Sequence, residues 1–173
     1  DKSIDIDKLE RLMAMQERMV ADGRRVAFVE AMTRMSPLLP RVAKHGTNTH
    51  QGTRYALLTD IDAAIRPLLT QEGFSLSFDS GPVEGAPGKM RVFLKCSHIQ
   101  GHSETIHIDL ALDKSGSKNE TQAGPSTIAY GRTVLTKMFF NLMTEADNTD
   151  GEDASFITAE QVKDLETMLA DTK

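Results

Sequence analysis

The sequence lacks the features that mark most membrane, secreted and catalytic proteins. Its one cysteine, Cys96, excludes an internal disulfide and suits a reducing cytoplasm. No apolar run approaches the roughly 20 residues of a membrane span, and no secretory signal peptide is visible. Walker loops, Gly-x-Gly-x-x-Gly turns, nucleophile elbows and His-Glu-x-x-His zinc motifs are all missing. We therefore expect a cytoplasmic protein that is not an enzyme, is not bound to a membrane and needs no cofactor.

Two sets of side chains invite a metal, but neither has the spacing of a known ion site. The acidic set is Asp147, Asp150, Glu152 and Asp153. It fails the EF-hand pattern because Gly151 comes one residue early. The histidines at 98, 102 and 107 lack the Cys or His partners typical of zinc. A divalent-metal-dependent nuclease built on the acidic turn stays open only as the least favoured alternative.

Acidic charge is concentrated at one end of the chain. The formal net charge is -5. Residues 1–57 and 89–140 each carry a net charge of +3, whereas residues 58–88 carry -4 and residues 141–173 carry -7. A local basic groove is compatible with this pattern, and so is a solvated surface of mixed charge. With 173 residues, 39% of them apolar, the chain can bury one core.

Hydrophobic spacing predicts helices before and after a small sheet. Residues 5–21 and 25–35 are expected to form two amphipathic helices separated at Asp22-Gly23. Residues 42–54 have the composition of a loop, and Thr59 is expected to cap a helix that Gly73 ends. A half-buried strand should follow from Phe74 to Asp79, because apolar and polar residues alternate there.

Residues 90–98 and 102–112 predict a β-hairpin whose register can be deduced. A three-residue loop with Gly101 left-handed pairs Val92 with Ile108 and Leu94 with Ile106, which keeps apolar residues on one face. The other face then carries Arg91, Phe93, Lys95, His107 and Asp109. Cations beside an aromatic ring suit single-stranded DNA, but the same set also fits an exposed strand face with one cross-strand ion pair.

A helix over residues 126–143 organises the chain. Its expected buried stripe is Ile128, Gly131, Leu135, Met138, Phe139 and Leu142. Tyr130 and Lys137 project on the opposite side, and Arg132 sits at the edge of the stripe. Tyr130 can stack on a base or fill a subunit contact. A Gly on the packing face makes sense where another segment comes close.

Two blocks of this sequence resemble the ERF family of phage-type single-strand annealing proteins. The first block is Tyr55-Ala56-Leu57-Leu58-Thr59-Asp60-Ile61, Ile65, Pro67-Leu68-Leu69 and Gly73-Phe74. The second is Gln122, Gly124, Ser126, Ile128, Tyr130, Arg132 and Leu135, followed by Asp147, Asp150 and Gly151. The second block departs from the family at Ala129, Thr133 and Val134, and Thr133 replaces a second arginine. Lys44 matches a lysine that is common in the family.

The resemblance implies an α+β fold, with a three-stranded antiparallel sheet packed on a central helix and flanked by N-terminal helices and a C-terminal helix. We expect an N-terminal helix in residues 1–22, an annealing core in residues 23–151, and a linker and helix in residues 152–173. The expected DNA-binding residues are Lys44, Arg54, Tyr55, Arg91, Phe93, Lys95, Lys114, Lys118, Tyr130, Arg132 and Lys137.

The implied function is binding of single-stranded DNA and ATP-independent annealing during homologous recombination. The implied partners are single-stranded DNA, the annealed duplex intermediate, further copies of the chain in a ring or helical filament, and an exonuclease or host single-strand-binding protein. The resemblance also implies a phage- or prophage-encoded protein of the bacterial cytoplasm. A single-strand-binding module that does not anneal is the main alternative.

Overall fold

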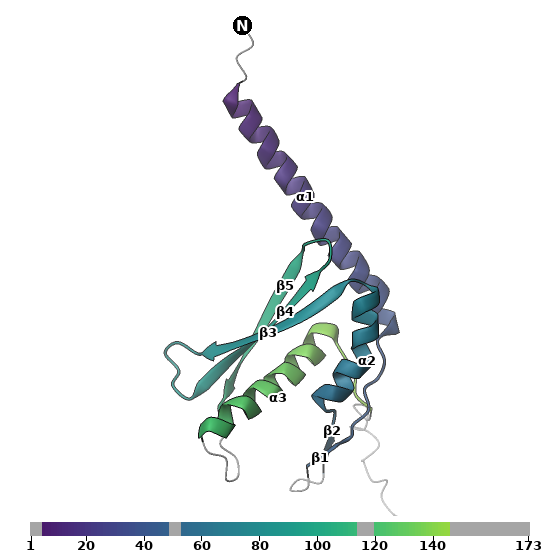
Figure 1. Cartoon of the computed structure of the whole chain (residues 1–173), viewed down its shortest axis with the longest axis vertical. Coiled ribbons are helices and arrows are strands. Elements are labelled where there is room, and N and C mark those ends of the chain that lie inside the picture. The colour runs from purple at the N-terminus through teal and green to yellow at the C-terminus, as the bar shows by residue number, and fades with distance from the viewer. Residues whose placement is uncertain (1–4, 49–52, 114–119, 146–173) are drawn as a thin grey trace, which may run out of the picture.

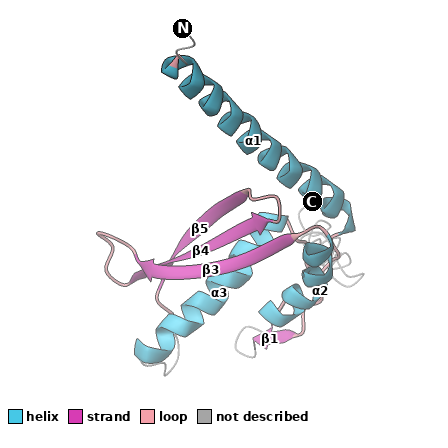
Figure 2. Ribbon diagram, turned by 45° about the horizontal axis from the view of Figure 1, so that its top comes forward, coloured by secondary structure: helices cyan, strands magenta, loops and turns pink. Residues whose placement is uncertain are grey.

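The described part of the protein has an α+β fold with one three-stranded antiparallel sheet, a two-stranded hairpin and three α-helices. The computed structural model describes residues 5–48, 53–113 and 120–145. In chain order the elements are α1 (Ile6–Met35), a short 3-10 turn η1 (Ser36–Leu38), β1 (Gly46–Asn48), β2 (Thr53–Tyr55), α2 (Leu58–Gln71), β3 (Phe74–Pro82), β4 (Lys89–His98), β5 (Ser103–Ala111) and α3 (Glu120–Phe140). Helix α3 lies along one face of the sheet, and α2 lies beside α3 (Figures 1 and 2).

Helix α1 is one continuous helix, so the prediction of two helices separated at Asp22-Gly23 is wrong. A glycine that ends a helix usually adopts a left-handed backbone, and Gly23 does not. A glycine inside a helix costs only about 1 kcal/mol, which 30 helical residues can absorb. The expected boundary between residues 22 and 23 therefore falls inside α1, and Figure 1 shows the N-terminal part of α1 standing away from the body.

The segment predicted as a loop before Tyr55 contains a short hairpin instead. Strands β1 and β2 pair antiparallel, with Gly46 opposite Tyr55 and Thr47 opposite Arg54. Each strand is three residues long, which is too short for the alternation that reveals a strand in sequence.

The three-stranded sheet has the order β3-β4-β5, and its predicted hairpin register is confirmed. Val92 lies opposite Ile108 and Leu94 opposite Ile106. Gly101 adopts a left-handed backbone (φ 91°), and the His98 amide donates to the His102 carbonyl across the three-residue loop. Strand β3 extends beyond the predicted Asp79 to Pro82. Val92, Leu94 and Cys96 are fully buried on the inner face of β4.

Helix α3 begins earlier than predicted, and its buried face is rotated from the predicted stripe. It starts at Glu120, so Pro125 lies inside the helix rather than before it. Thr127 and Thr136 are almost fully buried, whereas Met138, predicted in the stripe, is 64% exposed. Both threonine hydroxyls donate to the carbonyl four residues earlier, which satisfies them inside the core. The helix ends at Phe140, because Asn141 is left-handed and the Leu142 amide donates to the Lys137 carbonyl.

Gly131 lets α3 approach the sheet closely. A Cβ atom at this position would lie 2.8 Å from Cγ2 of Val92 and 3.2 Å from Cδ1 of Leu110. The close neighbours are side chains of β4 and β5, and any larger residue would push the helix away from them.

Helix α2 begins at Leu58 with Leu57 as its N-cap, so the predicted cap at Thr59 is two residues too late. The Asp60 carboxylate accepts a hydrogen bond of 3.1 Å from the Leu57 amide, which satisfies one of the free donors at the helix start. Pro67 lies inside α2 without ending it.

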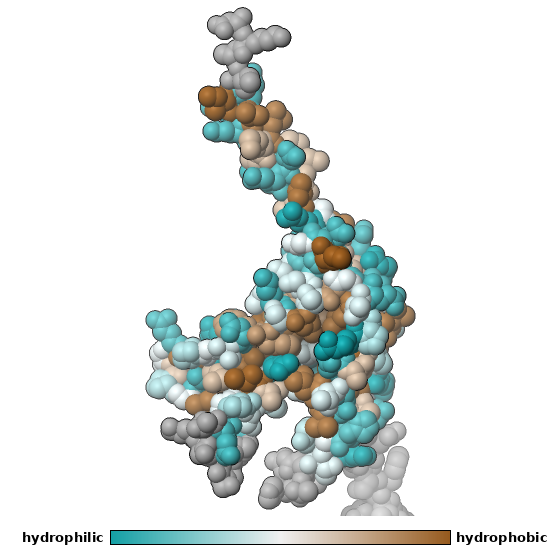
Figure 3. All heavy atoms as spheres, viewed as in Figure 1, coloured by the Kyte–Doolittle hydropathy of each residue, from teal (hydrophilic) through white to brown (hydrophobic). Residues whose placement is uncertain are grey.

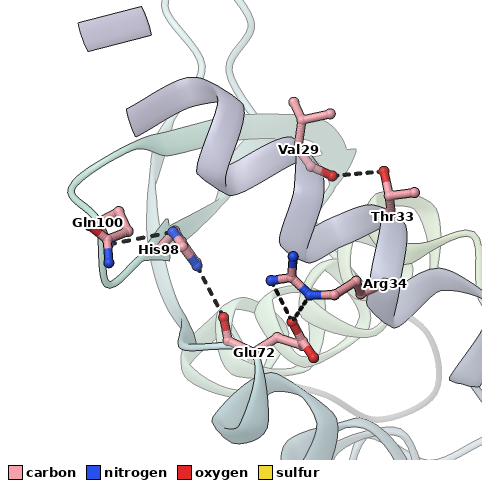
Figure 4. Close-up of polar contacts among 6 residues, drawn as sticks. All are labelled: Val29, Thr33, Arg34, Glu72, His98 and Gln100. Carbon is pink, nitrogen blue, oxygen red and sulfur yellow. Dashed lines mark hydrogen bonds and ion pairs between the residues drawn. The ribbon is translucent and has the colours of Figure 1, made fainter. Parts of the chain in front are cut away.

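One junction ties the C-terminal part of α1 to the end of α2 and to the β4–β5 turn (Figure 4). Arg34 donates to the Glu72 carboxylate at 3.0 Å. The Glu72 carbonyl accepts from Nε2 of His98 at 3.1 Å, so Nδ1 of His98 is left to accept from the Gln100 amide at 3.4 Å. The Phe28 ring packs edge-on against Phe74, with centroids 5.2 Å apart. The base of α1 is thereby fixed on the body, and the buried residues of α1 are Phe28, Ala31 and Met35.

Candidate nucleic-acid interface

A groove of about 1210 Å³ separates the β1–β2 hairpin from α3. The hairpin and the start of α2 form one wall of the groove, and α3 forms the other. The end of β5 and the segment that follows α3 complete its lining. Five of the predicted DNA-binding residues line this groove: Lys44, Arg54, Tyr55, Tyr130 and Lys137. The fold therefore brings together residues that are up to 93 positions apart in sequence, from Lys44 to Lys137.

Both tyrosines of the chain line the groove, one from each wall. Tyr55 is 50% exposed and Tyr130 is 62% exposed. Large aromatic side chains are usually buried, so two exposed rings in one groove are available for stacking on bases. Gly46 positions the first ring, because a Cβ atom there would lie 2.7 Å from Cε2 and Cζ of Tyr55. Gly46 was not among the predicted site residues, although a glycine in a segment rich in Thr and His was a visible signal.

The charge of the groove is positive. Lys44, Arg54 and Lys137 contribute cations, and Asp113 contributes one carboxylate. Within the described parts of the chain, neither Arg54 nor Lys137 forms an ion pair with a carboxylate. The Asp113 carboxylate is held by the Ser126 hydroxyl, which donates to it at 2.6 Å.

Two contacts hold the walls of the groove in place. At the hairpin, Nδ1 of His45 lies 3.1 Å from the carboxylate of Asp60. Desolvation alone would raise the pKa of Asp60, but the hydrogen bonds from Leu57 and His45 outweigh it and leave that pKa below its ordinary value. At the floor, the Val42 amide donates to the Met143 carbonyl and the Glu145 amide donates to the Val42 carbonyl, both at 3.0 Å. The second contact joins the chain after α1 to the chain after α3.

Arg132 does not reach this groove. Its guanidinium carbon lies 4.8 Å from the centroid of the Phe78 ring, and it lines a separate hollow of about 470 Å³ bordered by α2 and β3. Its Nε atom is buried without a hydrogen-bond partner among the described residues. The rotation of α3 explains this placement, because the face that carries Tyr130 and Lys137 turns toward the hairpin while Arg132 turns toward α2.

The outer face of the sheet carries three more of the predicted residues. Arg91 makes a two-pronged contact with Asp109, at 2.6 and 2.7 Å. These hydrogen bonds lower the pKa of Asp109 and raise the pKa of Arg91. The Phe93 ring lies 5.7 Å from the His107 ring, and Lys95 is exposed between Ser77 and Thr105. The structure therefore places five of the predicted residues in the groove, three on the outer sheet face and Arg132 in the separate hollow, while Lys114 and Lys118 lie outside the described residues.

Comparison with known proteins identifies the family. The model of the ERF superfamily matches residues 28–165, which is most of the chain. The chain belongs to the ERF superfamily. The resemblance read from the two sequence blocks is thereby confirmed. No curated protein and no solved structure matches the chain.

Membership of the ERF superfamily points to a role in phage single-strand annealing and recombination rather than in catalysis. Across the described residues, no helix combines the length and apolar character of a membrane span. No three His, Cys, Asp or Glu side chains gather as metal ligands in those same segments. The acidic turn of the nuclease alternative lies outside them.

Proposed function

We propose that this ERF-superfamily chain binds single-stranded DNA in the groove and anneals complementary strands without ATP. The observation that carries the proposal is the convergence of both tyrosines with Lys44, Arg54 and Lys137 in one groove. The cations hold backbone phosphates and the rings stack on bases, so the bound strand keeps its pairing edges open to a second strand. Base pairing supplies the free energy, so no nucleotide cofactor is needed.

The recombination context, the annealed duplex intermediate, the assembly of copies into a ring or filament, and the exonuclease or host partner belong to the same proposal. Family membership supports the recombination context. The groove is the first DNA contact. The outer sheet face, with Phe93 and Lys95, is a second contact for the displaced or incoming strand.

The electrostatic part of the proposal is tested by the salt dependence of binding to an oligothymidine strand. Each phosphate neutralised contributes a log–log slope of about -0.7, so the three groove cations predict about -2. Lys137→Ala should make the slope shallower by about 0.7 and weaken binding. Arg66→Ala is the matched control: it removes one exposed cation from α2, outside the groove, and should leave the slope unchanged.

The stacking part is tested with Tyr130, which is the more exposed of the two rings. Tyr130→Ala should weaken binding by about 1–3 kcal/mol, whereas Tyr130→Phe keeps the ring and should bind like the wild type. Annealing is measured as the ATP-free pairing of two complementary labelled oligonucleotides.

Four outcomes contradict the proposal in different ways. Binding without annealing favours the single-strand-binding module, and cleavage that depends on a divalent ion favours the nuclease. If Lys137→Ala and Tyr130→Ala both bind and anneal at the wild-type rate, the groove is not the DNA site, although the family membership stands. Loss of binding in Lys95→Ala or Phe93→Ala alone would move the site to the outer sheet face.

A further inference from the structure

The N-terminal part of α1, residues 6–26, stands away from the rest of the protein and is called the arm below. Figure 1 shows it extending beyond the sheet and the other helices. Every residue from 5 to 26 is exposed, and the buried residues of α1 begin at Phe28. At about 1.5 Å per residue the arm is about 30 Å long. Its base is braced, because the β4–β5 turn at Gly101 lies against the Arg24 side chain and the Arg34–Glu72 contact fixes the next turns.

The arm is amphipathic along its whole length. Projection at about 100° per residue places its large apolar side chains on one broad face and most of its charges on the other. The apolar face consists of Ile6, Leu9, Leu12, Met13, Met15, Met19, Val20 and Val26, each at least 46% exposed. Figure 3 shows apolar atoms, in brown, exposed at several places along the arm among hydrophilic ones in teal. Isolated helices of this length are marginal in water, and an apolar face of this size marks an interaction surface.

The charges of the arm are arranged in two opposite halves. Residues 6–17 carry three acidic and two basic side chains, a net charge of -1. Residues 18–26 carry three basic and one acidic side chain, a net charge of +2. When two arms lie side by side in opposite directions, the acidic half of each arm lies alongside the basic half of the other. In a parallel pair, halves of like charge lie together. The arm is thus complementary to a second copy of itself in one orientation.

We propose that the arm is a dimerisation element that pairs in antiparallel orientation with the arm of a second copy. The pairing buries both apolar faces and forms a two-fold symmetric, self-complementary contact. It holds the two bodies at opposite ends of the paired helices, so their DNA grooves do not compete for the same space. Single-stranded DNA is a poor occupant, because the exposed face is mainly apolar and residues 6–26 carry a net charge of only +1.

Self-association of the full chain is measured by sedimentation equilibrium across micromolar concentrations. Leu12→Glu and Met19→Glu place a charge in the apolar face and should each weaken association at least about tenfold, because one buried side chain of this size is worth more than that factor. Ala14→Glu introduces the same charge on the polar face and should associate like the wild type. Continued protection of the buried Cys96 thiol shows that the body stays folded in each variant.

Orientation is measured with cysteines on the arm, because the native Cys96 is buried. In an antiparallel pair, Leu9→Cys chains should cross-link to Gly23→Cys chains through a short bismaleimide much faster than either variant cross-links to itself. Faster self-cross-linking of Leu9→Cys would overturn the orientation.

Other results overturn the dimerisation itself. A wild-type chain that is a strict monomer, or one whose mass is unchanged by both Glu substitutions, shows that no second copy covers the arm. A monomer whose residues 146–173 lose protease protection in Leu12→Glu would assign the arm to that segment instead. None of these measurements involves DNA, so a failure leaves the proposed DNA binding in the groove untouched, although a strict monomer would also contradict the proposed ring or filament.

Discussion

Cys96 lies on the inner face of β4, where its surroundings govern its chemistry. Burial raises the pKa of this thiol to about 12, with a smaller contribution from the charge of Glu104. The thiolate is the reactive form, so the folded protein should react very slowly with a thiol reagent at pH 8. Denaturant should restore the rate of an ordinary cysteine. Rapid labelling of the native protein would show that β4 opens locally.

The sign of the linked pH dependence follows from the same pKa. Because the folded value lies above the ordinary value of about 8.5, the contribution to stability is complete below about pH 8.5 and is lost as the pH rises toward the folded value. Cys96→Ala should therefore remove one cause of alkaline destabilisation, as measured by denaturant unfolding at pH 8 and pH 10.

Residue identity predicted the chemistry of the candidate site better than its geometry. Lys44, Arg54, Tyr55, Tyr130 and Lys137 were all expected to bind DNA, and the fold brings them to one groove. The placement of Arg132 could not be predicted, because it depends on which side of α3 faces α2 and which faces the hairpin. The role of Gly46 could not be predicted either, because it requires the pairing of two three-residue strands.

At the scale of the element, the buried face of α3 makes a prediction that separates neighbouring side chains. Leu135 is fully buried, whereas Met138, one turn later, is 64% exposed. Leu135→Ala should lower the free energy of unfolding by about 2–5 kcal/mol. Met138→Ala should change it by less than about 0.5 kcal/mol, as for other surface substitutions. Urea unfolding measures both, and equal losses would mean that the stripe predicted from hydropathy is the buried one.

The two kinds of element differ in how far the sequence determines them. The β4–β5 register was predictable because alternation leaves one register that keeps apolar residues on one face, and Gly101 supports the turn. The buried face of α3 was not predictable in this way. The hydroxyls of Thr127 and Thr136 donate to carbonyls of the helix backbone, so both side chains pack like apolar residues. A prediction from hydropathy treats both threonines as polar, so the predicted stripe is shifted from the face that is buried.

Helix α1 shows the same limit in another form. An amphipathic helix was predicted here, but no pattern distinguishes a helix that folds onto its own core from one whose apolar face stays exposed, as in residues 6–26. Gly23 also suggested an end that the structure does not have, because a helix-ending glycine requires a left-handed backbone.

At the scale of the whole molecule, charge pairs on the sheet predict how stability responds to acid. Hydrogen bonds from Arg91 hold the pKa of Asp109 below its ordinary value, against desolvation. Because the folded value is depressed, the contribution of Asp109 to stability is present above about pH 4 and is lost as the pH falls through the folded value.

The test compares wild type with Asp109→Asn. The variant should be less stable at pH 7, and the difference should shrink as the pH falls below about 4 and through the folded value, because the wild-type carboxylate then becomes protonated. Asp7→Asn, on the exposed arm, is the control, and its stability should change with pH in the same way as that of the wild type. A difference that stays constant from pH 7 to pH 3 would show that the Arg91–Asp109 pair does not titrate with folding.

The placement of both tyrosines in the groove gives the molecule an optical property. The chain has no tryptophan, so its ultraviolet fluorescence comes from Tyr55 and Tyr130 alone. Both emitters line the groove. A base stacked on either ring would quench its emission, so an unlabelled sample would itself report on occupancy. Tyr55→Phe and Tyr130→Phe each leave one emitter, so the light lost on adding DNA can be assigned to one wall of the groove at a time.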